Sequence, residues 1–160
     1  MKKRVYIETS IPSFYFETRT EPEMVACRNW TVDWWAKESH KYELVTSLAV
    51  VEELKKDPHP NQKKALDFIL DISLVPLVQE IDLIVDEYIE HFVMPKNPKG
   101  DALHLALASW HHCHFLLTWN CKNLANANKF EHIRHMNAIL GLYVPILATP
   151  TELMENTEEK

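Results

Sequence analysis

The sequence predicts an α/β fold in which helices cover both faces of a mostly parallel sheet. Short segments rich in β-branched and aromatic residues alternate along the chain with longer segments that have helical periodicity, and this alternation is typical of parallel sheets. Residues 115–119 form a continuous apolar run of strand length, as expected of a strand buried on both faces. A chain of 160 residues suits a single core, so we expect one domain over 1–150 and a flexible acidic tail over 151–160.

The predicted strands are short and end at polar or turn-forming residues. The first, residues 4–8, is rich in β-formers and is followed by Thr9 and Ser10. The second, residues 43–46, is followed by Ser47, which suits the N-cap position of the next helix. The full set of predicted strands comprises residues 4–8, 43–46, 74–78, 115–119 and 144–148.

The predicted helices follow from residues that recur every three or four positions. The pattern is clearest in residues 80–94, where Phe92 lies on the apolar face. In residues 22–41 the same spacing places Trp30 and Trp34 on the inward face. The predicted helices comprise residues 22–41, 48–56, 60–72, 80–94, 101–113 and 129–140.

Composition excludes several classes of protein. With only two glycines, the chain has no glycine-rich phosphate loop of the Walker or dinucleotide-binding type. Three cysteines without close pairing do not suggest a disulfide framework, so we expect a reducing, cytoplasmic environment. The longest apolar runs are shorter than the roughly 20 residues of a membrane helix, and Glu8 and Pro12 interrupt any signal peptide. About half of the net charge of −6 lies in the last ten residues.

Four acidic or amide side chains stand where predicted strands end or predicted helices begin. Glu8 ends the first strand, Glu53 lies in the helix after the second, Asp101 opens a later helix, and Asn120 follows the strand 115–119. The carboxyl ends of parallel strands meet at one crevice, so we expect these residues to converge there. Carboxylate and amide oxygens suit Mg²⁺ or Mn²⁺, and we predict Glu8, Glu53 and Asp101 as the metal ligands.

A divalent metal at this position gives the predicted site a chemistry. It generates hydroxide from bound water, orients the hydroxide in line with a phosphodiester and stabilises the leaving oxygen, so no nucleophilic side chain is required. Thr9, Ser10 and Thr118 are then expected to supply hydroxyls that orient the carboxylates or phosphate oxygens.

Ordinary structural roles compete with this interpretation. Asp101 stands where a helix dipole favours an acid in any protein, and Asn120 can simply cap the turn that follows it. A zinc site is the alternative that the histidines suggest, because several crowd residues 104–114. His104 and His111 share a helix face, but two turns separate them, which is too far for both to reach one ion easily.

Four segments resemble, in order and at fitting spacing, the motifs of PIN-domain nucleases, and among these the VapC-type toxins of prokaryotic toxin–antitoxin systems. The opening segment VYIETSIPS, residues 5–13, resembles the family's strand that ends in an acid followed by Thr-Ser. The second and third acidic positions are matched by VEEL at 51–54, with Glu53 as the acid, and by DALHLA at 101–106. The fourth segment is matched by LLTWNCKNLANA at 116–127.

The resemblance implies a PIN-like, three-layer α/β/α domain with a parallel sheet of four or five strands, and an endoribonuclease that depends on Mg²⁺ or Mn²⁺. It also implies a homodimer and an antitoxin partner whose basic tail enters the acidic groove. Two residues depart from the family pattern. Glu8 replaces the usual Asp, and Asn120 replaces a residue that is frequently acidic, which leads us to expect a weaker second metal.

Two other functions remain open from the sequence. The first is a catalytically silent PIN-like module that binds RNA or protein, which the absence of stabilisation by Mn²⁺ would favour. The second is an unrelated α/β enzyme of small molecules, which would have a deep apolar pocket in place of an open acidic groove.

Overall fold

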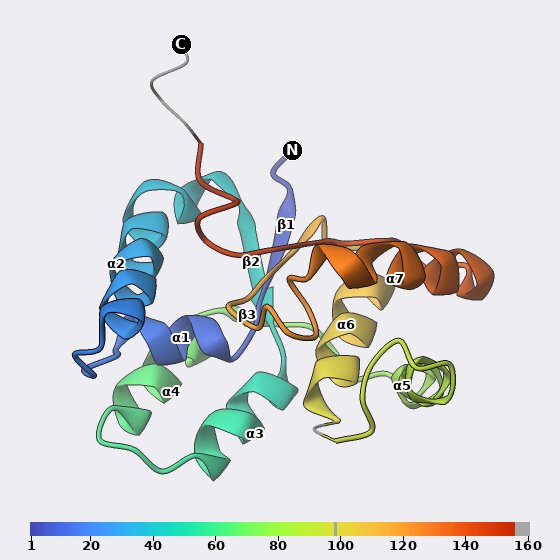
Figure 1. Ribbon diagram of the computed structural model, residues 1–160, viewed down its shortest axis with the longest axis horizontal. Coiled ribbons are helices and arrows are strands. Elements are labelled where there is room, and N and C mark those ends of the chain that lie inside the picture. Colours follow the sequence, from blue (N-terminus) through green and yellow to red (C-terminus); the bar gives the residue numbers. More distant parts are fainter. Residues whose placement is uncertain (98, 156–160) are drawn as a thin grey trace.

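A computed structural model of the protein, describing residues 1–97 and 99–155, has a parallel sheet of five strands at its centre (Figure 1). The strand order is β3-β2-β1-β4-β5, and every neighbouring pair is parallel. The strands are β1 (Arg4–Ile7), β2 (Glu43–Thr46), β3 (Ser73–Leu74), β4 (Phe115–Leu117) and β5 (Ile146–Ala148). The expected α/β class, with four or five mostly parallel strands between helices, is confirmed.

Helices cover the sheet on both sides. Figure 1 shows α1, α2 and α4 on one side and α5, α6 and α7 on the other, with α3 near the end of the sheet toward which the strands run. The helices are α1 (Ser10–Tyr15), α2 (Pro22–Lys37), the 3-10 turn η1 (Ser39–Lys41), α3 (Leu48–Lys56), α4 (Gln62–Leu70), α5 (Glu80–Glu90), α6 (Gly100–Trp110) and α7 (Ala127–Leu140).

The two outer strands are shorter than the sequence pattern indicates. β3 ends at Leu74, two residues before Pro76, and β5 begins at Ile146, directly after Pro145. Proline has no backbone N–H to give to a sheet ladder, so each proline limits its strand. The central strands are buried on both faces, as the apolar run in β4 indicates.

Helix ends also differ from the expected boundaries. α5 ends before Phe92, which has φ of 58° and is 86% exposed, and α6 ends before His112, which has φ of 54°. A residue in the left-handed region cannot continue a right-handed helix. Phe92 therefore does not join the apolar face on which the sequence pattern placed it.

The packed face of α2 differs from the predicted one. Trp34 is fully buried, as expected, but Trp30 is 42% exposed. The second buried position of this helix is Thr31, three residues before Trp34. The expectation that Trp30 points inward was therefore wrong, because the buried stripe follows Thr31 and Trp34 and is too narrow to include Trp30.

Residues 151–155, the first half of the predicted acidic tail, contact the domain. The indole nitrogen of Trp34 donates to the Leu153 carbonyl over 3.3 Å, and the Glu155 amide donates to a carboxylate oxygen of Glu38 over 3.2 Å. Lys41 forms an ion pair with Glu155 at 3.2 Å. Residues 156–160 lie outside the described residues. Among the helices that the structure describes, none has the length and apolar character needed to cross a membrane.

Candidate metal centre

Glu8 lies directly after β1 and is held by hydroxyl groups. The residue is 6% exposed. Its Oε1 atom accepts hydrogen bonds from the Ser10 amide at 3.2 Å, the Ser10 hydroxyl at 2.5 Å and the Thr118 hydroxyl at 2.5 Å. Such donors offset part of the cost of burying a carboxylate. Its Oε2 atom accepts no hydrogen bond from any residue that the structure describes, so this oxygen can still take a ligand.

Glu53 of α3 and His104 of α6 contact each other beside Glu8. The His104 side chain is 1% exposed, and its Nε2 atom contacts Oε1 of Glu53, whose side chain is 40% exposed. One ligand atom from each of Glu8, Glu53 and His104 lies within 4.8 Å of the other two. The strands carry these residues to one place because β1 and β2 run in parallel toward the same end of the sheet, where α3 lies and α6 begins (Figure 1).

The surroundings of His104 raise its pKa. Burial alone lowers the pKa, because it disfavours the charged imidazolium, but the hydrogen bond with Glu53 and the nearby carboxylates of Glu53, Glu8 and Asp101 raise it by more. Behind the ring, Nδ1 lies 2.8 Å from the hydroxyl of Tyr6. Burial raises the pKa of that hydroxyl well above its usual value, so Tyr6 remains a neutral phenol.

Asp101 stands in the first turn of α6, three residues before His104, and is 7% exposed. Its Oδ1 accepts from the side-chain amide of Asn120 at 3.0 Å, and its Oδ2 accepts from that of Asn123 at 2.7 Å. The Asn120 backbone amide donates to the Thr118 hydroxyl at 2.9 Å. Hydrogen bonds therefore connect Asp101 through Asn120 and Thr118 to Glu8, although Asp101 is not in the converging group.

The hydroxyl groups that the sequence singled out have different surroundings. Ser10 and Thr118 both donate to Glu8, and Ser10 also accepts from the Trp119 amide at 2.8 Å. The Thr9 hydroxyl is buried and has no hydrogen-bond partner among the residues described. Ser10 and Thr118 thus fix the Glu8 carboxylate, whereas Thr9 makes no such contact.

Two residues of this region did not stand out in the sequence. His104 was considered only together with His111, whose ring contacts the Pro76 carbonyl at 2.8 Å, away from His104. The spacing of three residues from Asp101 to His104 places both on one helix face and could have indicated the role. Asn123 follows Asn120 by the same spacing and was not considered.

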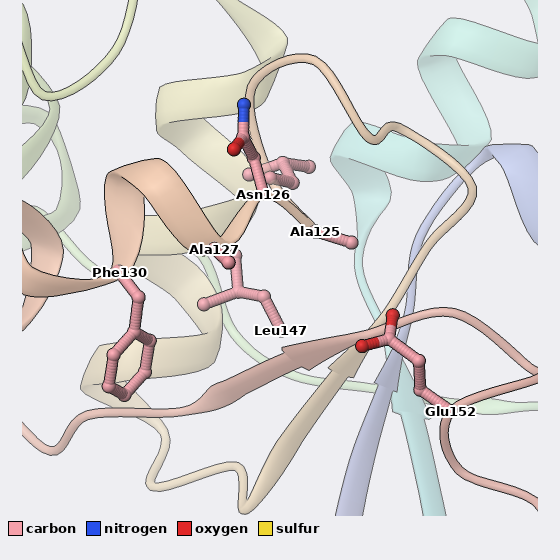
Figure 2. Close-up of a pocket in the computed structure, with 7 residues that line it drawn as sticks. Ala125, Asn126, Ala127, Phe130, Leu147 and Glu152 are labelled. Atoms are coloured by element: carbon pink, nitrogen blue, oxygen red, sulfur yellow. The ribbon is translucent and has the colours of Figure 1, made fainter.

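A pocket of about 270 Å³ lies elsewhere, between the start of α7, the loop before it and β5 (Figure 2). Its polar groups have local structural roles. The Asn126 side chain accepts from the Asn128 amide as the N-cap of α7, and Glu152 accepts from the Thr149 amide at 3.1 Å. The pocket shares no residue with the converging group, so the cluster around Glu8 remains the candidate site.

Comparisons with known proteins show the fold. No protein-family model and no curated protein sequence matches the chain. Among solved structures, a chain of the crystal structure of VapBC2 from Rickettsia felis bound to a DNA fragment from their promoter is similar, with a TM-score of 0.54 and 15% sequence identity. The match covers 91% of this chain and 98% of that chain. At this identity the likeness concerns the fold alone, and the parallel α/β architecture of the protein is therefore PIN-like.

Proposed function

We propose that this protein is a metal-dependent endoribonuclease, the toxin component of a type II toxin–antitoxin system of the VapC kind. The observation that carries the proposal is the convergence of Glu8, Glu53 and His104 in a PIN-like fold. Two carboxylates and an imidazole that gather at the strand ends need a cation or a proton to offset their charge.

The donor set fits a divalent metal such as Mn²⁺ or Mg²⁺. Ligand atoms about 2.0 to 2.2 Å from one ion lie roughly 3 to 4.4 Å from each other, close to the 4.8 Å limit within which the three atoms lie here. Glu8 and Glu53 are proposed to bind the metal directly, and Nε2 of His104, the third atom of the converging group, is proposed to bind it beside them when metal is present and to hold Glu53 when it is not. Asp101 is proposed as the third carboxylate and Asn120 as a polar fourth member, both joined to Glu8 by the hydrogen bonds through Thr118.

A bound metal supplies an activated water and stabilises the charge that develops on a phosphodiester. The protein's own groups hold the site in shape. Ser10 and Thr118 direct the Glu8 carboxylate, His104 holds Glu53, and the amide of Asn120 restrains Asp101. These contacts fix side chains before substrate arrives, which lowers the cost of reorganisation during the reaction.

The biological setting follows from the same proposal. The substrate is RNA, the protein works in the cytoplasm as a homodimer, and an antitoxin holds it inactive. The similarity to VapBC2, whose structure contains a promoter DNA fragment, supports a partner of this kind.

A matched pair of glutamates in α3 tests the proposal. Glu53 contacts His104, whereas its neighbour Glu52 is exposed and pairs only loosely with Lys55, at 3.8 Å. Cleavage of structured RNA is measured with Mn²⁺ for the parent, Glu53→Gln and Glu52→Gln. We expect Glu53→Gln to lose at least about 100-fold in rate and Glu52→Gln to stay within about 2-fold. Equal rates in all three proteins would reject the proposed site.

One observation favours a second function, a catalytically inactive PIN-like module that binds RNA or protein. Both oxygens of Asp101 already accept amide hydrogen bonds, as in a carboxylate whose role is structural. Such a module binds RNA in a gel-shift assay but cleaves none, and Mn²⁺ does not raise its melting temperature. The nuclease predicts the opposite result in both assays.

A further inference from the structure

Three buried polar side chains, linked by hydrogen bonds, lie behind the candidate metal centre. The Tyr6 hydroxyl is 2.7 Å from the Ser47 hydroxyl and 2.8 Å from Nδ1 of His104. All three residues are buried. They come from β1, from the residue after β2 and from α6, so only the folded sheet brings them together.

The Ser47 side chain forms a hydrogen bond with Tyr6 instead of capping α3. It occupies the N-cap position of α3, where a serine side chain ordinarily accepts a hydrogen bond from the first turn of the helix. Here the side chain makes no capping hydrogen bond and pairs with Tyr6. The serine hydroxyl is therefore linked through Tyr6 to Nδ1 of His104.

We propose that Tyr6 is a positioning residue of the metal centre, whose hydroxyl, held by Ser47, fixes the His104 ring so that Nε2 faces Glu53 and Glu8. This inference rests on the proposed metal-dependent function. Histidines that bind metals nearly always engage their second ring nitrogen with an outer partner, which sets the orientation and tautomer of the ring. Tyr6 is that partner here.

The chemistry of the hydroxyls suits this task. A phenol or an alcohol both donates and accepts, so Tyr6 can accept from a protonated Nδ1 while donating to Ser47, or donate to Nδ1 while accepting from Ser47. In the first arrangement the lone pair of Nε2 is free for a metal. Without metal, Nε2 carries a proton and donates to Glu53, either in the second arrangement or, when both ring nitrogens are protonated, in the first. One fixed ring position therefore serves the metal-bound and the metal-free protein.

Tyr88 provides a matched control. It is also fully buried, and its hydroxyl also bridges two polar side chains, Ser109 at 3.3 Å and Asn137 at 2.5 Å. Neither partner belongs to the candidate metal centre. Tyr6→Phe and Tyr88→Phe each remove one buried bridging hydroxyl, so a general loss of stability should appear in both, and a loss of metal binding only in the first.

The experiment measures Mn²⁺ binding to the full chain by calorimetric titration, with the melting temperature of each metal-free variant recorded alongside. We expect Tyr6→Phe to weaken Mn²⁺ binding by about 10- to 100-fold and Tyr88→Phe by less than about 2-fold. Ser47→Ala, which leaves Tyr6 and His104 intact, should weaken binding by a smaller factor and serves if Tyr6→Phe does not fold.

The outcomes separate this inference from the proposed function. If the parent binds Mn²⁺ and cleaves RNA while Tyr6→Phe and Ser47→Ala bind as the parent does, the positioning role is rejected and the nuclease stands. If Tyr88→Phe weakens binding as much as Tyr6→Phe, the effect is general loosening and the role is also rejected. A parent that binds no Mn²⁺ overturns both.

Discussion

Replacing Glu8 by glutamine removes the charge of the most buried carboxylate in the converging group and keeps its shape. The side-chain oxygen of Gln can still accept the three hydrogen bonds that Oε1 of Glu8 accepts from Ser10 and Thr118. The new amide takes the place of Oε2, which accepts no hydrogen bond from the described part of the chain. The substitution therefore isolates charge and metal ligation from packing.

Without metal, opposing electrostatic effects leave little net change in stability. Over the 4.8 Å limit between ligand atoms, Glu8 and Glu53 repel by about 3.5 kcal/mol at an effective dielectric near 20, and the partial exposure of Glu53 reduces this further. The attraction between Glu8 and a protonated His104 has a similar size and the opposite sign. We expect metal-free Glu8→Gln to melt within about 4 °C of the parent, or about 1 kcal/mol.

With Mn²⁺ the melting temperatures of the parent and Glu8→Gln should differ. A ligand that binds only the native state at 100 times its Kd stabilises by about 2.7 kcal/mol, which for a chain of this length raises the Tm by roughly 5 to 11 °C. We expect this shift in the parent and in Glu52→Gln, and no shift above about 2 °C in Glu8→Gln. The assay is thermal unfolding followed by circular dichroism across a Mn²⁺ series. A full shift in Glu8→Gln would show that the metal binds elsewhere.

Two further predictions follow from local geometry. In Gly100→Ala the added Cβ would lie 3.1 Å from Oε1 and 3.3 Å from Cδ of Glu53. We expect the thermal stability to be unchanged or slightly higher, but the Mn²⁺ affinity measured by calorimetric titration to fall by about 5-fold, because the displaced Glu53 adds strain of about 1 kcal/mol. An unaltered affinity would contradict the placement of Glu53. Among the thiols, exposed Cys121 should react first with a colorimetric disulfide reagent, and half-buried Cys27 should react later. Burial raises the pKa of Cys113 to about 12, so this thiol should react only on unfolding. Early reaction of Cys113 would contradict its burial.

Much of the fold follows from local patterns in the sequence. Residues 43–46 and 48–56 form β2 and α3 with the boundaries that the pattern indicates. The wrong predictions concern where helices end and which of their faces is buried. Phe92 lies beyond the end of its helix with a positive φ, and Trp30 stays exposed because the buried stripe of α2 follows Thr31 and Trp34. Periodicity reports which residues can share a face, but packing partners decide how wide the buried stripe is.

By itself, the sequence determined that Glu8 and Asn120 stand at strand ends, Asp101 at a helix start and Glu53 in the helix after the second strand, because secondary-structure periodicity and the rules of parallel sheets are local or topological. Only the tertiary structure decided which side chains meet. In the folded protein His104, which the sequence pattern had set aside because of its spacing from His111, contacts Glu53. Both carboxylate oxygens of Asp101 accept hydrogen bonds from asparagine side-chain amides. The physical reason is that contacts between α3, α6 and the strand ends depend on helix rotation and side-chain packing, to which residues distant in sequence contribute.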